Sequence, residues 1–446
     1  MAATYEELRD QLAELIAIPS VSADPDHAGD VERAAAWVAN RIRDAGGEAD
    51  VVPWKGSRPL VIGEVRASQG ADSAPTVLTY AHFDVQPPDP LELWETPPFE
   101  LAERDGWLFA RGVADDKAQL VMLVEAARQL AAVGELPVNV RFAFDSEEEV
   151  GGQSVVEWVA ADERGADAAI VFDGDMVESG VPTFNTALRG LCYFHVTVRT
   201  GERDLHSGLF GGVALNAMHA LMQTLSAVIA KDGRVPEPLR IGITPPTPEE
   251  VEGWRTLPDG ADSLAGVGAQ PSDAKALDQY YVRMWAEPSV DVHGIAGGSP
   301  DLVKTVLPVE ARANVSIRIA PGQNVNDVRA TFERLLREAA PTGASVDVEL
   351  VSAAEPGLVS PDARALSLAR EAFEQVFGRR SLLVRVGGSV PVVASLAARG
   401  IPTISTGLAT SDANAHSPNE KFPARYLTLG VEAVSETYRR LGELGS

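Results

Sequence analysis

Cysteine is almost absent from this sequence, since Cys192 is the only one among 446 residues. A lone cysteine excludes an internal disulfide and fits a reducing compartment. Basic residues are also scarce: 38 Lys and Arg stand against 64 Asp and Glu, a formal net charge of −26. This balance argues against nucleic acid and against anionic membranes as partners, because both attract basic protein surfaces.

Long apolar runs are missing too. No run approaches the roughly 18 residues that a membrane-spanning helix needs. The first residues, MAATYEELRDQL, are acidic and predict a helix rather than a basic leader followed by an apolar segment. We therefore expect a cytoplasmic protein, and the length predicts two or three domains.

Apolar strands alternate with helices in the first part of the chain. Residues 4–18 and 30–46 have helical periodicity, and the short apolar runs EADVV, LVIGEV and TVLTYA follow them. A helical stretch, AQLVMLVEAARQLAAVG, then precedes the strand VNVRFAFD. This alternation predicts an α/β fold with a mostly parallel sheet covered by helices on both faces.

The pattern changes near Thr186. Residues 192–198 alternate between apolar and polar side chains, which is typical of a half-exposed antiparallel strand. Residues 232–290 are rich in Pro, Gly and acids and are interpreted as long connections, and the helix-then-strand rhythm returns from Ser360. We therefore expect a catalytic domain formed by residues 1–186 and 356–446, interrupted by a smaller α+β domain at 187–355.

Five short stretches carry residue types that bind metals: AHFDV at 81–85, VADDK at 113–117, SEEEVGG at 146–152, IVFDGD at 170–175 and NAHSP at 414–418. His82, the Glu148–Glu149 pair and Asp173 each follow an apolar strand, so they would converge at the carboxyl ends of a parallel sheet. On an extended chain Asp84 shares a face with His82 and would hold its imidazole in one tautomer.

Each stretch also has a simpler interpretation. A lone aspartate at a strand end is more often a turn or cap residue, and a run of glutamates is more often a solvated surface. The occurrence of all five stretches at these positions is much harder to explain by chance, and together they favour a metal site.

These stretches resemble the signatures of the cocatalytic zinc peptidase family that includes carnosinase, aminoacylase, succinyl-diaminopimelate desuccinylase and bacterial glutamate carboxypeptidase. The similarity covers nearly the whole chain, and HFDVQPPDPLELWETPPFE, DLHSGLFGG and AHSPNE are most similar to its dipeptidase branch. The resemblance implies a catalytic α/β domain interrupted by a lid and dimerisation domain. One departure is Ala118, where the family usually has glycine; alanine should be tolerated at the start of a helix.

The resemblance implies a role for each matched residue. His82 and Asp173 would bind one metal, Glu149 and His416 the other, and Asp115 would bridge both. Glu148 would be the general base, and Asp84 would orient His82. The run of three glutamates is aligned so that Glu147 remains as a spare surface acid. The resemblance also implies a cis peptide bond between Asp115 and Asp116.

The resemblance implies that Arg318 in the inserted domain binds a substrate carboxylate together with Gly387, Gly388 and Ser389. His206 would stabilise the oxyanion, acting across a homodimer formed by the lid domains. Without the resemblance, Arg318 would be an outward-facing strand arginine, the Gly-Gly-Ser stretch a tight turn, and His206 a cap on its own turn.

The function expected is that of a dinuclear metal dipeptidase acting on dipeptides with a free C-terminal carboxylate. The alternative within the family is an amidohydrolase, a deacylase or carboxypeptidase, acting on N-acylated amino acids. Two divalent ions are expected, zinc first, with manganese or cobalt also compatible with nitrogen and oxygen ligands. A metal-binding protein without catalysis is the rival of another class, but such a protein would not need Glu148.

Overall fold

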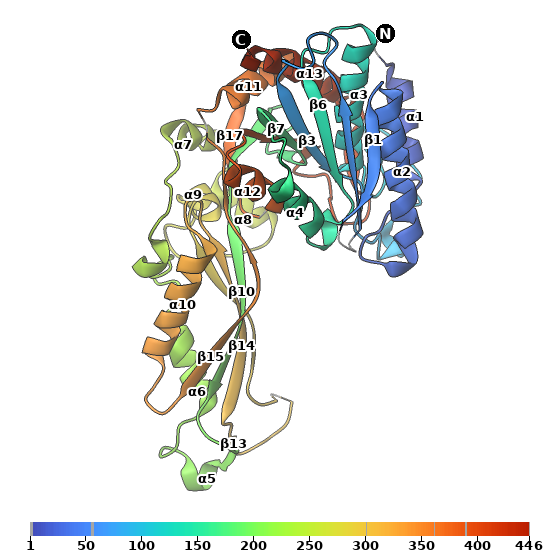
Figure 1. Ribbon diagram of the computed structural model, residues 1–446. Coiled ribbons are helices and arrows are strands. Elements are labelled where there is room, and N and C mark those ends of the chain that lie inside the picture. The colour runs from blue at the N-terminus through green and yellow to red at the C-terminus, as the bar shows by residue number, and fades with distance from the viewer. Residues whose placement is uncertain (1–2, 55–57, 300, 361, 389, 446) are drawn as a thin grey trace. The chain divides into compact units, whose positions relative to one another are not determined.

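The computed structural model describes residues 3–54, 58–299, 301–360, 362–388 and 390–445. The chain divides into two compact units by its contacts. Unit 1 comprises Met1–Thr186, Val359–Val384 and Pro391–Ser446, and unit 2 comprises Ala187–Leu358 and Arg385–Val390. Both ends of the chain therefore belong to unit 1, as the blue and red helices of Figure 1 show.

Unit 1 is built on a mixed sheet with the strand order β1-β2-β6-β3-β7-β18-β9. Its strands are β1 (Glu48–Pro53), β2 (Pro59–Val65), β3 (Thr76–His82), β6 (Asn139–Asp145), β7 (Ala168–Phe172), β9 (Thr183–Leu188), β17 (Leu382–Val386, beside β9) and β18 (Thr403–Thr406). The central strands β6, β3, β7 and β18 are parallel, and the flanking pairs β1-β2, β2-β6 and β18-β9 are antiparallel. The predicted sheet with a parallel centre is confirmed.

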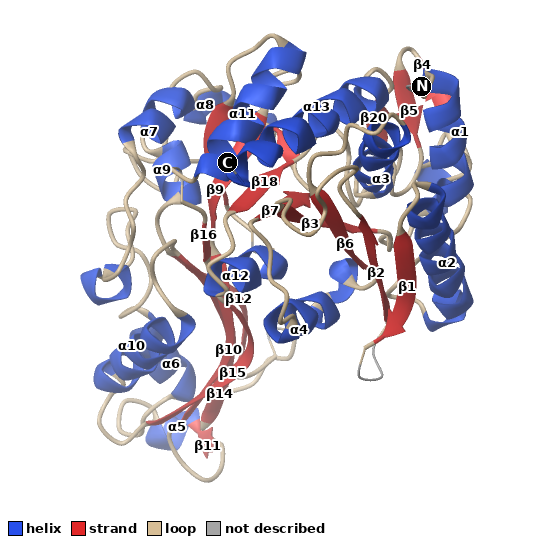
Figure 2. Ribbon diagram, turned by 45° about the horizontal axis from the view of Figure 1, so that its top comes forward, coloured by secondary structure: helices blue, strands red, loops and turns tan. Residues whose placement is uncertain are grey.

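Helices cover both faces of this sheet. They are α1 (Tyr5–Ile16), α2 (Ala28–Asp44), α3 (Lys117–Ala132), α4 (Gln153–Ala161), α11 (Arg364–Phe377), α12 (Pro391–Ala398) and α13 (Tyr426–Leu441). Helices α1, α2, α3, α11 and α13 pack against one another in one layer, and α4 and α12 lie side by side in another (Figure 2). Short strands complete the unit: β4 (Ala102–Arg104), β5 (Trp107–Phe109) and β20 (Lys421–Pro423) form one sheet, and β8 (Asp175–Met176) and β19 (Ala409–Thr410) another.

The sequence dictates the start of α1 directly. The hydroxyl of Thr4 accepts the N–H of Glu7, and the Glu7 carboxylate accepts the N–H of Thr4. This capping box satisfies two backbone donors that a helix start leaves free. Leu8, Leu12 and Leu15 then fall on one buried stripe, as their spacing predicts.

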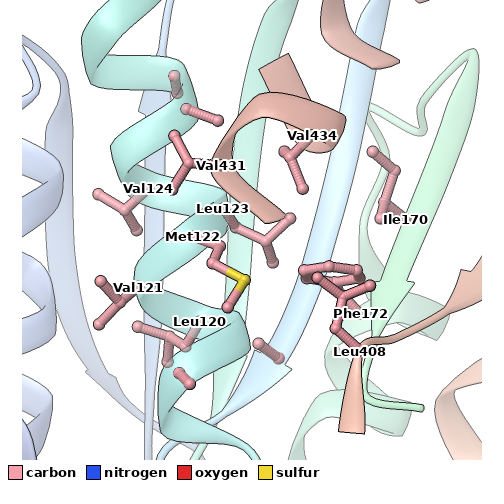
Figure 3. Close-up of a cluster of buried hydrophobic side chains, with 14 of the residues drawn as sticks. Leu120, Val121, Met122, Leu123, Val124, Ile170, Phe172, Leu408, Val431 and Val434 are labelled. Atoms are coloured by element: carbon pink, nitrogen blue, oxygen red, sulfur yellow. The ribbon is translucent and has the colours of Figure 1, made fainter. Parts of the chain in front are cut away.

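Helix α3 is buried along nearly its whole length and forms the centre of the core. Figure 3 shows its side chains Met122 and Leu123 directed toward Val434 of α13 and Phe172 at the end of β7. Each such buried side chain stabilises the fold by about 1.5–3 kcal/mol. Helix α3 begins at Lys117, two residues after Asp115, so this buried helix anchors the end of the loop that carries Asp115.

Unit 2 contains a separate four-stranded antiparallel sheet, with the order β12-β14-β10-β15. Its strands are β10 (Gly190–Arg199), β12 (Ser289–Ala296), β14 (Glu310–Ile319) and β15 (Ser345–Ala354). The short strands β11 (Leu205–His206) and β13 (Val306–Leu307) form a sheet of their own, and β16 (Gly357–Leu358) pairs with the last two residues of β9. Along β10, Cys192, Phe194 and Val196 are buried and the residues between them are more exposed, as the alternation predicts. Helices α6 (Ala217–Leu225) and α10 (Val325–Ala339) cover the apolar face, where Phe194 and Phe332 stack at 4.7 Å.

The interpretation of residues 232–290 as long connections is wrong in part. The segment contains α7 (Pro248–Trp254), α8 (Gly260–Gly266), α9 (Tyr280–Trp285) and a 3₁₀ turn, and α5 (Ser207–Phe210) lies further upstream. These helices are too short to give a clear periodicity, and aromatic packing holds them: the rings of Trp254 and Trp285 lie 5.2 Å apart. No helix in the described ranges has the length and apolar character that crossing a membrane requires.

Candidate metal centre

The candidate centre forms where the parallel strands of unit 1 end. β3 ends at His82, and β7 ends one residue before Asp173. β6 leads into a 3₁₀ turn, Glu148–Val150, that carries Glu148 and Glu149. Because parallel strands end at one edge of a sheet, these side chains start close together, as the sequence predicts.

Asp115 lies between the two histidines. It belongs to the loop between β5 and α3, and His416 belongs to the loop between β19 and β20. Oδ1 of Asp115 is 2.9 Å from Nε2 of His82, and Oδ2 is 3.0 Å from Nε2 of His416. One carboxylate thus directs its two oxygens at two different imidazoles, which is the arrangement that a bridging ligand requires.

The other two predicted metal ligands, Asp173 and Glu149, lie near His82 and His416 respectively. Asp173 Oδ1 is 3.7 Å from Nε2 of His82, and Glu149 Oε2 is 3.0 Å from Nε2 of His416. The donor atoms of Asp115, Glu149 and His416 lie within 4.8 Å of one another. Imidazole nitrogens and carboxylate oxygens are ligands for zinc, and they also suit manganese or cobalt. The residues present therefore fit a pair of divalent ions.

Asp116 also lies near His82 and Asp173, with donor atoms within 4.8 Å of theirs. Its two oxygens are already engaged, however, because Oδ1 accepts Nε2–H of Gln119 at 2.7 Å and Oδ2 accepts the N–H of His82 at 3.2 Å. Asp116 thereby supports the end of β3, whereas the two oxygens of Asp115 face the two imidazoles. The Asp115–Asp116 peptide bond is cis, which confirms that prediction.

Asp84 is fully buried and holds two parts of the centre together. Its Oδ1 is 3.3 Å from Nδ1 of His82, the place predicted for a residue that orients the imidazole. Its two oxygens also accept the backbone N–H groups of Glu148 and Glu149, both at 3.2 Å. Asp84 thereby fixes the turn that carries these glutamates, a contact that the sequence did not reveal.

The prediction that Glu147 is a spare surface acid is wrong. Its side chain is buried, and Oε1 accepts the N–H of Ser154 at 2.8 Å and also the Ser154 hydroxyl. The carboxylate therefore supports the start of α4, where a negative charge is favourable.

Electrostatics in unit 1 favour cations at the centre. Burial opposes a positive charge on His82, but the carboxylates of Asp173 and Asp115 outweigh it and raise the pKa of the imidazole well above its ordinary value. Hydrogen bonds to Asp115 and Glu149 raise the pKa of His416 to about 10. The carboxylates thus attract positive charge between them, and divalent ions would supply it.

A cavity of about 380 Å³ lies beside the centre within unit 1. Asp115, Asp173, Thr410 and Asn414 line it, and so does Asp175, whose carboxyl pKa is raised by burial. Such a volume is large enough for a small substrate group next to the metal ligands.

The residues predicted to bind the substrate carboxylate or the oxyanion belong to unit 2. Arg318 lies half-buried on β14, and no carboxylate in the described part of the chain forms an ion pair with it. Gly387 and Gly388 follow β17, whereas Ser389 lies outside the described residues. His206 is exposed at the end of β11, and its Nδ1 accepts the N–H of Gly208 at 3.0 Å. Within one copy of the chain His206 therefore caps its own turn.

Three further residues near these sites escaped the sequence analysis. Gln86 donates to both oxygens of Glu149, from its backbone N–H at 3.2 Å and from Nε2 at 2.8 Å. Nε of Arg189 donates to the carbonyl of Gly387 at 3.2 Å. The Glu420 carboxylate accepts the backbone N–H groups of Ala114 and Asp115. The signal for Gln86 was its place two residues after Asp84 on an extended segment, but the other two contacts join residues far apart in sequence.

Comparisons with known proteins identify the family of the chain. A family model described as peptidase family M20/M25/M40 matches residues 78–440. The chain is 29% identical to a cysteinylglycine-S-conjugate dipeptidase of Corynebacterium striatum, over 88% of this chain and 85% of that protein. It is 27% identical to a human beta-Ala-His dipeptidase, over 86% and 78% of the two chains.

Among solved structures, an M20 family metallo-carboxypeptidase of Sulfolobus solfataricus superposes with a TM-score of 0.82 at 24% identity, covering 98% of this chain and 99% of that one. This likeness confirms the fold. Since the family model matches most of the chain, the resemblance inferred from the motifs is also confirmed, and the chain belongs to peptidase family M20/M25/M40.

Proposed function

We propose that the chain is a dinuclear metal-dependent dipeptidase that hydrolyses dipeptides with a free C-terminal carboxylate. The observation that carries this proposal is the position of Asp115, with one oxygen facing His82 and the other facing His416. The relatives from Corynebacterium striatum and from human are both called dipeptidases, which supports the choice of substrate.

Each residue of the centre has a place in the reaction. His82, Asp115 and Asp173 would hold one cation, and Asp115, Glu149 and His416 the other. Bound there, the cations would polarise the scissile carbonyl and lower the pKa of a water molecule. Glu148 takes the proton from the attacking water and delivers it to the leaving amine.

The substrate termini provide the remaining contacts. The guanidinium of Arg318 suits bidentate binding of a carboxylate, and Gly387, Gly388 and Ser389 would add backbone donors and a hydroxyl. In unit 1, Asp175 lines the 380 Å³ cavity beside the proposed metal ligands, and its carboxylate would attract the ammonium group of a dipeptide. This negative charge favours a free amino terminus over a neutral acyl group, and so a dipeptide over an N-acylated amino acid.

A substrate panel tests the proposal. Zinc-loaded protein is expected to hydrolyse dipeptides, and N-acetylation of the same dipeptides should lower kcat/KM by about 10–100-fold, the value of a hydrogen bond to a charged group. Asp175→Asn should reduce the ratio of kcat/KM between free and N-acetylated dipeptides. Faster hydrolysis of N-acetyl or N-succinyl amino acids than of any dipeptide would contradict the proposal and favour the amidohydrolase.

His206 is proposed to act in a homodimer. Exposed apolar residues, Leu209, Phe210 and Val213, follow it closely, and a second copy of the chain would cover them. His206→Ala and Glu148→Ala subunits should each be nearly inactive, since an oxyanion donor contributes about 10²–10³ in rate. Their verified heterodimer should regain activity, because one site then has both residues. A heterodimer as inactive as its parents would show that His206 does not act on the partner.

A further inference from the structure

Glu420 is a fully buried carboxylate that no step of the proposed reaction uses. It lies four residues after His416, directly before β20. Its two oxygens accept four hydrogen bonds, and all four donors come from the loop that leads to Asp115. These donors are the backbone N–H groups of Gly112 (2.9 Å), Ala114 (2.8 Å) and Asp115 (3.1 Å) and Nη1 of Arg111 (2.7 Å).

Arg111 extends this contact to the loop that follows His82 and Asp84. The guanidinium is buried, its Nη2 donates to the carbonyl of Pro87 at 3.3 Å, and it lies 5.5 Å from the ring centroid of Trp94. One buried ion pair thus ties together the segments after β3, before α3 and before β20.

Asn419 strengthens the same junction. Its Oδ1 accepts the N–H of Glu95 at 2.9 Å, and its Nδ2 donates to the carbonyl of Leu93 at 2.8 Å. The segment from 414 to 420 is therefore bonded to both neighbouring loops through its last two residues.

The backbone around His416 needs such an anchor. Asn414, His416 and Asn419 have φ values of +55°, +62° and +60°. Residues other than glycine rarely adopt this left-handed conformation, and they keep it only where the surroundings impose it. Held only at its ends, this loop would leave the His416 imidazole free to move away from Asp115.

We propose that Glu420 is a positioning residue for the metal centre: it fixes the loop of Asp115 and the loop of His416 at the spacing that the second cation requires. The inference rests on the proposed metal centre. A carboxylate suits this task because four donors meet at its two oxygens, whereas a glutamine would direct its own N–H groups at backbone donors.

The competing explanation is that Glu420 and Arg111 merely stabilise the core. Unit 2 offers a matched control for it. Glu250 is equally buried, and its carboxylate pairs with the buried Arg385, at 2.8 Å from Nε and 3.1 Å from Nη2. Glu250→Gln therefore makes the same chemical change in a buried ion pair, in the unit that contains none of the proposed metal ligands.

The experiment compares Glu420→Gln, Glu250→Gln and the unchanged full-length chain. Zinc affinity is measured by competition with a chelator, ligand geometry by the absorption spectrum of the cobalt-loaded protein, and stability by the thermal midpoint. Both variants should lower the midpoint. Only Glu420→Gln should weaken zinc binding, by about 10–100-fold, and alter the cobalt spectrum, as expected of a residue that supports metal ligands.

Asn419→Ala serves as a milder variant should Glu420→Gln fail to fold, because Asn419 is only half-buried. It should weaken zinc binding in the same direction. Wild-type zinc affinity in Glu420→Gln, or an equal loss in Glu420→Gln and Glu250→Gln, would overturn the role of Glu420. If Glu420→Gln does not fold, wild-type zinc affinity in Asn419→Ala would overturn it instead. A wild-type chain that binds no divalent ion would instead contradict the metal centre itself, and this proposal with it.

Discussion

Glu148→Gln is expected to lower kcat for dipeptide hydrolysis by about 10²–10⁴-fold while both metal ions stay bound. This is the usual contribution of a general acid–base group. Glu148 belongs to neither group of proposed metal ligands. The turn that carries it is held by the Asp84 carboxylate, which accepts the backbone N–H of Glu148, and the substitution leaves this hydrogen bond in place. Metal content by atomic absorption and kcat under saturating substrate measure the two effects separately.

Glu149→Gln is the matched control for this result, since it makes the same change one residue further along. Glu149 Oε2 is 3.0 Å from Nε2 of His416. Replacing this carboxylate with an amide should therefore release the ion proposed to lie among Asp115, Glu149 and His416. If Glu148→Gln released metal and Glu149→Gln retained it, the alignment of the three glutamates would be wrong by one residue.

Asp115→Asn should have a still broader effect, the loss of both ions rather than one. Its two carboxylate oxygens face His82 and His416, and an amide offers only one oxygen and no charge. The activity lost should exceed the roughly 10–100-fold that follows removal of a residue supporting a metal ligand. Zinc stoichiometry after dialysis and residual kcat/KM are the measurements.

Asp116→Asn distinguishes the two neighbouring aspartates. Asp116 accepts hydrogen bonds from Gln119 and from the backbone of His82, so its replacement should weaken metal binding less than that of Asp115. The bridging assignment would fail if Asp116→Asn abolished binding of both ions and Asp115→Asn did not.

The sequence predicted those parts of the centre that follow from strand topology. His82 and Asp173 are adjacent to apolar strands, and the carboxyl ends of parallel strands meet at one edge of a sheet. Asp115 and His416 have no such local signal, because they lie on loops, and only the family resemblance assigned them to metals. The structure brings their side chains together, and the variants described above test their roles.

The residues that escaped prediction act through contacts between distant segments. Glu420 binds backbone N–H groups more than 300 residues earlier in the chain, and such donors leave no trace in side-chain patterns. Glu147 was misplaced on the surface because a run of three glutamates usually faces water, whereas here Ser154 gives its carboxylate buried partners. The short helices of residues 232–290 were missed because six or seven residues are too few to define a helical period.

Anomalous diffraction at the zinc edge, from crystals of the unchanged chain grown with zinc, tests the central claim most directly. The account predicts two peaks, one among His82, Asp115 and Asp173 and one among Asp115, Glu149 and His416, with the Asp115 carboxylate contacting both. A single peak, or two peaks that do not share Asp115, would contradict it.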